Sequence, residues 1–272
     1  MRSDWSTLKQ PAPTALVEAR KLAHHAIQWA TRAARANLPA VPDDSHTVLA
    51  WDPEQQALVS QAFAGGVRVG LRIGSMELLF IRPPKAAEII SLQDASAGGA
   101  GKWLDSRLEG AALKPARPVK LPYEVAAVSF SGAAKQSAAT RQLGRWFAAA
   151  AEVLEEFKAQ VRGGQPSPVV CWPHHFDMAT VVSLTKPDTS VGIGISPGDE
   201  YYAQPYAYVS PYPRPAAPRL PELPPGGHWH TKDFLGAVAV AGDILPLRDA
   251  RAAMLVFIRG AFDSSKEMLE RG

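Results

Sequence analysis

The chain has little cysteine, little net charge and no long apolar run, and each shortage excludes a class of protein. Its 272 residues contain one cysteine, Cys171, which excludes an internal disulfide and a cysteine-based metal cluster. The 29 basic and 26 acidic residues are spread along the chain, without the concentrated basic face of a nucleic-acid-binding protein. No apolar run reaches the roughly 20 residues needed to cross a bilayer, and the start lacks a signal peptide's apolar stretch. We therefore expect a soluble cytoplasmic protein without nucleic-acid or membrane partners.

Common catalytic sequence patterns are also missing. The segment Gly98–Lys102 resembles a phosphate-binding loop, but Trp103 stands where a Ser or Thr is required. No G-x-S-x-G pattern occurs, so nothing favours α/β-hydrolase chemistry. His24 and His25 are neighbours in an alanine-rich helical segment, where adjacent side chains face different directions. They are therefore expected to be a partly exposed pair rather than a pair of ligands.

Apolar residues at helical spacing predict three helices. They recur from about Thr14 to Leu38, from about Thr140 to Val161, and from Pro246 towards the end of the chain. Gly163 follows the second helix, and the fixed φ of Pro246 suits a first helical position. With 46% hydrophobic residues, the chain has ample apolar material for a core.

Alternation of apolar and polar residues predicts strands between these helices. Val67–Ile73 alternates, and Gly74-Ser75 fits a two-residue hairpin turn leading into Met76–Ile81. Residues 95–101 predict a small-residue loop, and residues 211–227 a proline-rich segment that crosses the surface in extended form. Further strands are expected at residues 169–172, 178–184, 191–195, 206–209 and 235–240.

The order of these elements predicts an α+β fold, in which helices flank a largely antiparallel sheet. We expect one compact unit over residues 1–272. A helix followed by a meander with a tryptophan in its first strand occurs twice, once with Trp51 and once with Trp172. Internal duplication into halves 14–135 and 136–272 and chance similarity both explain this recurrence.

Histidines and an aspartate suggest a metal site. On a strand, His175 and Asp177 would share one face, and so would His228 and His230. His175, Asp177 and His230 together are the ligand types of a two-histidine-one-carboxylate iron site, and they could also hold zinc. A divalent metal ion is thus a candidate cofactor. The alternative is that each histidine bonds to its local backbone, which is commoner for so short a pattern.

The segment Ser196–Tyr202 predicts a turn that presents acidic side chains. Pro197-Gly198 fits the centre of a type II turn at the end of a strand. Asp199 or Glu200 could then act as a general base beside a histidine, or simply lie on an exposed turn.

Aromatic residues gather in the same part of the chain. Residues 170–231 contain five of the six tyrosines and 11 of the 24 prolines. Gly192 and Gly194 share a strand face that either a tyrosine ring or a ligand could approach, and packing by Tyr206 or Tyr208 is the preferred explanation. The candidate ligand-binding residues are Trp172, Glu200, Tyr201, Tyr206 and Tyr208.

The motifs resemble those of an uncharacterised family of bacterial proteins, a domain of unknown function. The resemblance rests on the segments Trp172–Asp177, Ser196–Tyr202 and Pro205–Pro211, and extends more loosely to His228–Thr231 and Leu121–Tyr123. It implies no activity. It does imply that one constellation contains His175, Asp177, Ser196, Gly198, Asp199 and Tyr206.

Three hypotheses of function follow. The first is a small-molecule site built from Trp172–Asp177, Ser196–Tyr208 and His228–Thr231, in which His175 or His230 could act as an acid or base with Asp177 or Asp199. The second is the metal site. In the third, the motifs hold a long proline-rich loop in place and the protein is an interaction or scaffold module.

Overall fold

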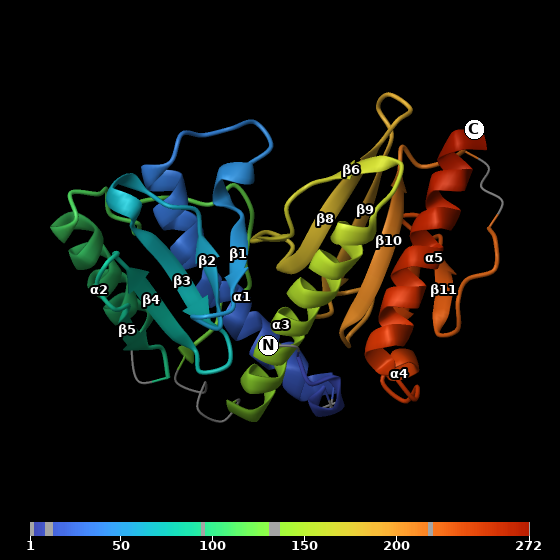
Figure 1. Ribbon diagram of the computed structural model, residues 1–272. Helices are drawn as coiled ribbons and strands as arrows, with labels where there is room; N and C mark the ends of the chain where they lie inside the picture. Colours follow the sequence, from blue (N-terminus) through green and yellow to red (C-terminus); the bar gives the residue numbers. More distant parts are fainter. Residues whose placement is uncertain (1–2, 9–12, 94–95, 131–136, 217–219, 272) are drawn as a thin grey trace. The chain divides into compact units, whose positions relative to one another are not determined.

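The computed structural model describes residues 3–8, 13–93, 96–130, 137–216 and 220–271, and it has the predicted α+β architecture (Figure 1). The chain divides into two compact units. The first unit comprises Pro11–Arg145 together with Cys171–Phe176, and the second comprises Met1–Gln10, Trp146–Val170 and Asp177–Gly272. Each recorded strand pair in either unit is antiparallel.

The first unit is an antiparallel meander with α1 packed on β2 and β3. Ile27 and Ala30 on α1 are fully buried, and burying a side chain such as Ile27 contributes about 1.5–3 kcal/mol. The sheet order is β7-β1-β2-β3-β4-β5, and Leu49 pairs with Cys171. The elements are α1 (Pro13–Asn37), η2 (Ser45–Thr47), β1 (Leu49–Asp52), β2 (Ala57–Ser60), η3 (Ala64–Gly66), β3 (Arg68–Arg72), β4 (Glu77–Ile81), β5 (Glu88–Ser91), α2 (Ala97–Gly110) and β7 (Val170–Trp172).

The second unit has two long helices on one face of its strands. In Figure 1, α3 and α5 lie side by side in front of β8, β9 and β10, and Phe157 of α3 contacts Phe262 of α5. The sheet order is β11-β12-β10-β9-β8, with β6 paired to β8. The elements are η1 (Trp5–Thr7), α3 (Ser137–Gln160, of which Trp146 onwards belongs to this unit), β6 (Gly164–Pro166), β8 (Asp177–Leu184), β9 (Ser190–Ser196), β10 (Tyr206–Tyr212), β11 (Gly227–His230), β12 (Gly236–Val240), α4 (Ala241–Ile244) and α5 (Ala250–Arg271).

The same kind of turn recurs along the chain. Four-residue turns follow β1, β3 and β7, and each ends in a residue with positive φ: Gln56 at 50°, Met76 at 55° and Phe176 at 59°. The turns after β1 and β7 both begin with proline, at Pro53 and Pro173. This recurrence agrees with the helix-and-meander order in both halves, while a common origin of the halves stays a prediction.

The structure corrects several sequence-based boundaries. The two-residue turn at Gly74-Ser75 is wrong, because the turn runs from Ile73 to Met76. The last helix begins at Ala250 rather than near Pro246, which lies between α4 and α5. Strands β5, β6 and β11 were not predicted, since β5 has no buried residue and the others are very short.

The predicted small-residue loop is mostly a helix. Ala95 lies outside the described residues, but Ala97 begins α2, and the Ser96 hydroxyl caps it by accepting from the amide of Gly99 at 3.0 Å. Leu104 and Leu108 are fully buried on this helix. Their burial outweighs the low helix propensity of the glycines.

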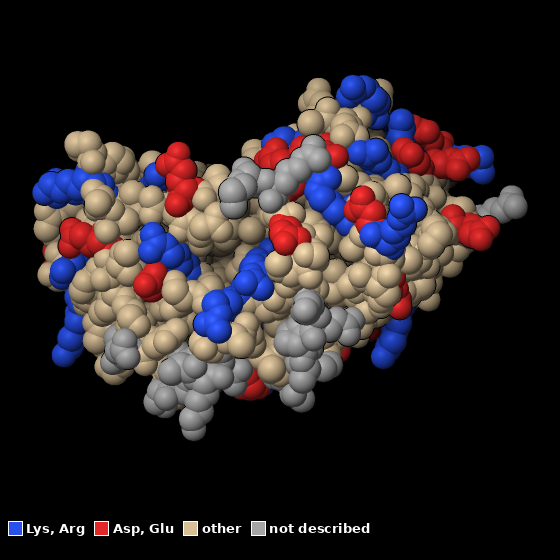
Figure 2. Space-filling view, turned by 60° about the horizontal axis from the view of Figure 1, so that its bottom comes forward, with Lys and Arg blue, Asp and Glu red and all other residues tan. Residues whose placement is uncertain are grey.

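The surface carries both signs of charge. On the face shown in Figure 2, basic and acidic side chains are interspersed. Arg251 of α5 illustrates how such groups are used, because its guanidinium pairs with both Glu152 and Glu156 of α3. This ion-pair network joins the two helices that cover the second unit.

Candidate functional site

The predicted site residues are distributed over both compact units. Trp172 and His175 belong to the first unit, whereas Asp177, Asp199 and His230 belong to the second. The grouping of all these residues around one hollow stays a prediction.

In the first unit, the turn Pro173–Phe176 is fastened to α1. The Nε2 of His24 and the side-chain amide of Gln28 both donate to the carbonyl oxygen of Pro173, each at 2.9 Å. The His24 ring also stacks on Phe176, with centroids 5.2 Å apart and planes 10° apart. Gln28 in turn accepts from the hydroxyl of Tyr123 at 2.8 Å. The expectation that His175 and Asp177 share a strand face is wrong, because His175 lies in this turn.

The same turn gathers further imidazole groups. The rings of His174 and His175 are 4.2 Å apart, and Trp172 and Tyr123 also contact His174. Burial lowers the pKa of His24, and the nearby Arg20 and His174 add to this effect. Burial and the charge of His175 likewise lower the pKa of His174. Burial therefore favours the neutral form of His24 and His174. The part of the cluster that α1 supplies was not predicted from the sequence.

In the second unit, one face of the sheet points away from the helices. Ile195 contacts α3 and Gly227 lies against Phe257 of α5, so the alternate residues of these strands face the other way. On that second face, Tyr208 pairs with Gly194, and a Cβ added at Gly194 would collide with the Tyr208 ring. The preferred explanation for the glycine face, packing by a tyrosine, is thus confirmed at Gly194, whereas a Cβ added at Gly192 would meet only the Ser210 carbonyl oxygen at 3.9 Å.

Tyr208 also makes a hydrogen bond that spans two strand spacings. Its hydroxyl donates to the carboxylate of Asp177, which is buried. Burial, then the charge of Asp177, raises the pKa of Tyr208 well above its usual range. The phenol therefore stays protonated and acts as a donor. This contact favours a structural role for Asp177, while its catalytic role stays a prediction.

Asp199 organises the turn before β10. Gly198 has a φ of 105°, as the type II turn requires, and the Ser196 hydroxyl accepts from its amide at 3.1 Å. One carboxylate oxygen of Asp199 accepts from the amides of Tyr201 and Tyr202, at 2.9 and 3.1 Å. The other accepts from the hydroxyl of Tyr206. These contacts position the turn, and the role of Asp199 as a base stays a prediction.

Beside this turn, a tyrosine hydroxyl joins two histidines of β11. His228 and His230 are two residues apart on β11, as expected for an extended segment. The Tyr202 oxygen lies 3.0 Å from Nε2 of His228 and 2.9 Å from Nδ1 of His230. The other nitrogen of His230 donates to the carbonyl oxygen of Lys232. Phe234 stacks on the His230 ring at a centroid distance of 4.1 Å, so one face of this ring and both of its nitrogens are in contact with protein groups.

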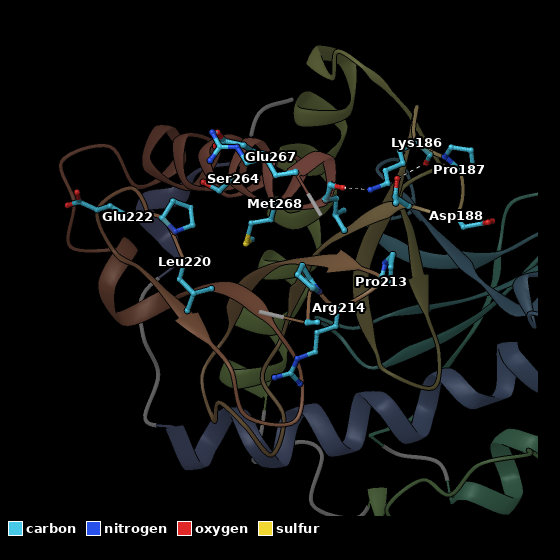
Figure 3. Close-up of a pocket in the computed structure, with 16 residues that line it drawn as sticks. Lys186, Pro187, Asp188, Pro213, Arg214, Leu220, Glu222, Ser264, Glu267 and Met268 are labelled. Atoms are coloured by element: carbon cyan, nitrogen blue, oxygen red, sulfur yellow. Dashed lines mark hydrogen bonds and ion pairs between the residues drawn. The ribbon is translucent and has the colours of Figure 1, made fainter. Parts of the chain in front are cut away.

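A groove of about 1060 Å³ lies elsewhere in the second unit (Figure 3). Met268 of α5 and Leu220 of the proline-rich segment line it, with charged groups such as Lys186, Asp188 and Glu222 around them. Its walls are the turn between β8 and β9, residues 213–216 and 220–222, and the C-terminal end of α5. None of the predicted site residues lines this groove. One feature of the sequence indicated the groove, the high proline content of residues 211–227, because part of this segment forms one wall.

Hydrogen bonds hold the walls of the groove in place. Lys186 donates to the carbonyl oxygen of Leu269 at 3.0 Å, which joins the β8–β9 turn to α5. Arg214 donates to the carbonyl oxygen of Thr231 at 2.9 Å, and the indole of Trp229 donates to that of Pro221 at 2.8 Å. The proline-rich wall is therefore attached to β11 and to the residue that follows it.

The expected iron or zinc set finds no support in these contacts. In the part of the chain that the structure describes, no three His, Cys, Asp or Glu side chains are arranged to hold a metal ion. Within the second unit, the Asp177 carboxylate accepts from Tyr208, whereas Nδ1 of His230 lies against Tyr202. His175 lies in the turn on α1 in the first unit.

Comparison with known proteins gives no further identification. No family model matches the chain, and neither the curated proteins nor the solved structures include a match. The resemblance to an uncharacterised bacterial family therefore stays a prediction. Among the described residues, no helix has both the length and the apolar character needed to cross a bilayer.

Proposed function

We propose that this protein binds a small amphipathic molecule in the groove of the second unit. The observation that supports the proposal is the groove volume of about 1060 Å³, which matches the upper end of pockets that hold small ligands. The sequence motifs predicted a small-molecule ligand among the tyrosines and histidines. The groove would bind a ligand of the same class at a different place.

The lining determines the kind of molecule that fits. Leu220, Met268 and Pro213 provide apolar surface, whereas Lys186, Asp188 and Glu222 place charges of both signs around it. A ligand with an apolar body and polar ends would bury the first group and leave its ends near the second. We place this function in the cytoplasm of a bacterium, where the buried thiol of Cys171 would stay reduced.

A dye titration tests the proposal. The neutral apolar dye Nile red should bind the purified protein and become fluorescent, and Leu220→Glu should weaken its binding at least tenfold. Full burial of a leucine contributes about 1.5–3 kcal/mol, which corresponds to a factor of about 10–100 in Kd. Co-purified small molecules, measured by mass spectrometry of the denatured protein, should be depleted in the same variant.

Leu247→Glu is the matched control. Leu247 is 38% exposed and Leu220 is 39% exposed, but Leu247 precedes α5 while the groove lies at the other end of that helix. The control variant should bind the dye as the unmodified protein does. Equal binding by both variants, or no binding by the unmodified protein, would refute the groove as a ligand site.

A further inference from the structure

Three donor atoms in the second unit lie close enough together to surround a metal ion. They are Nε2 of His228, Nδ1 of His230 and the hydroxyl oxygen of Tyr202, which lies between the two nitrogens at 3.0 and 2.9 Å. We propose that they form a binding site for a divalent transition-metal ion, and for Cu²⁺ in particular. The site is independent of the groove and of the ligand proposed there.

The kind of donor is what favours copper, while the spacing of the donors permits a metal ion. In a square-planar site with metal–ligand distances of about 2.0 Å, neighbouring donors lie about 2.8 Å apart, whereas tetrahedral zinc separates them by about 3.3 Å. The two observed separations, 3.0 and 2.9 Å, are hydrogen-bond lengths that lie between these values, so small shifts of the side chains would admit an ion in either geometry. Tyr202 would be the middle donor, with one imidazole on each side. Copper also binds nitrogen and oxygen donors more tightly than zinc does.

The surroundings of His230 are those of a metal ligand. Its Nε2 donates to the carbonyl oxygen of Lys232, which leaves Nδ1 as the nitrogen that lies against Tyr202 and that a metal ion would bind. The stacked ring of Phe234 fixes the orientation of the imidazole. A backbone carbonyl that accepts from the second nitrogen is the usual partner of a metal-bound histidine.

The local charge also suits a cation. Asp199 is in the turn that carries Tyr202, and its carboxylate accepts from the amide of this tyrosine at 3.1 Å, which places a negative charge beside it. The same negative charge attracts a metal ion, and a bound ion would in turn stabilise the phenolate. His228 is exposed on β11, so an ion can reach the site from solvent. Among the described residues, His228 has no hydrogen-bond partner besides Tyr202, and can turn towards an ion.

Isothermal titration calorimetry tests the proposal. The metal-free, tag-free protein is titrated with Cu²⁺ and, separately, with Zn²⁺. One equivalent of Cu²⁺ should bind, at least tenfold more tightly than Zn²⁺. His228→Asn and His230→Asn should each weaken Cu²⁺ binding at least tenfold. Tyr202→Phe should abolish a phenolate-to-copper charge-transfer band in the visible spectrum while the imidazoles still bind.

His175→Asn is the control, because His175 belongs to the first unit. Its Cu²⁺ affinity should equal that of the unmodified protein. Far-UV circular dichroism should show that all variants are folded, and His228→Asn alters an exposed residue that folding tolerates. Absence of Cu²⁺ binding, or binding that both His228→Asn and His230→Asn leave unchanged, would overturn the proposal. Tighter binding of Zn²⁺ than Cu²⁺ would overturn the assignment of copper.

Discussion

The contact of Tyr208 with Gly194 leads to a sharp prediction about the second unit. Gly194→Ala adds a methyl group that would overlap the Tyr208 ring, so the ring has to move. Its hydroxyl would then lose the hydrogen bond to the buried carboxylate of Asp177. Overpacking of this kind costs about 1–3 kcal/mol and a lost bond to a charged group about 1.5–3 kcal/mol. We expect a destabilisation of about 3–5 kcal/mol, a large part of the roughly 5–15 kcal/mol by which domains are usually stable.

Gly192→Ala is the matched control for this prediction. Gly192 lies on the same strand and the same face, but the nearest atom to an added Cβ is the Ser210 carbonyl oxygen at 3.9 Å. The control should change stability by less than about 1 kcal/mol, in the stabilising direction, because alanine reduces the entropy of the unfolded chain. Tyr208→Phe removes the hydrogen bond to Asp177 without overpacking, so it should lower the unfolding free energy by the hydrogen-bond contribution alone, about 1.5–3 kcal/mol.

Hydrogen exchange of the amides of β8, β9 and β10 is the suitable measurement, because it follows the second unit separately from the first. Gly194→Ala should accelerate this exchange strongly and Gly192→Ala should not. In the Tyr208→Leu background, Gly194→Ala should cost much less, as a double-mutant cycle would measure. Equal protection in the two alanine variants would refute the packing of Tyr208 on Gly194.

Three further perturbations test the roles assigned to polar groups. Asp199→Ala should destabilise the second unit by about 2 kcal/mol in urea unfolding, because the turn amides and the hydroxyl of Tyr206 lose their acceptor. The first unit should lose stability as the pH falls below the ordinary histidine pKa of 6.5, since the lowered pKa of His24 means that the unfolded chain takes up the proton first. His24→Phe keeps the ring contact and should make this pH profile less steep, at the expense of one hydrogen bond to Pro173, while His174 still contributes to it. Arg251→Met should lower the unfolding free energy by about 1–3 kcal/mol, because two carboxylates on α3 lose a cation that is only 17% exposed, and a thermal melt would detect this.

Much of the secondary structure follows from local patterns. The helices near residues 14–38 and 140–161 were predicted almost to their ends, because each buries apolar side chains at helical spacing. The alternation in Val67–Ile73 likewise placed β3. These patterns are local because a helix or strand needs only one apolar face to be specified.

The turn after β7 shows why local patterns fail. Phe176 adopts a positive φ of 59°, which a bulky residue rarely does and which the sequence does not reveal. The conformation is supported by burial of Phe176, by its stacking on His24 and by the bond from His24 to Pro173, which joins residues 149 positions apart. Assigning these residues to a strand gave the wrong relation between His175 and Asp177.

The amino-acid sequence thus determined the class of fold, the two longest helices, most strands and the segment in which polar and aromatic groups gather. The tertiary structure decided which of these groups meet: His24 with Pro173, Tyr208 with Asp177 across Gly194, and Tyr202 with the histidines of β11. It also decided where the groove lies. The physical reason is that periodicity fixes the face on which a side chain lies, whereas its partner depends on strand register and on contacts between distant segments.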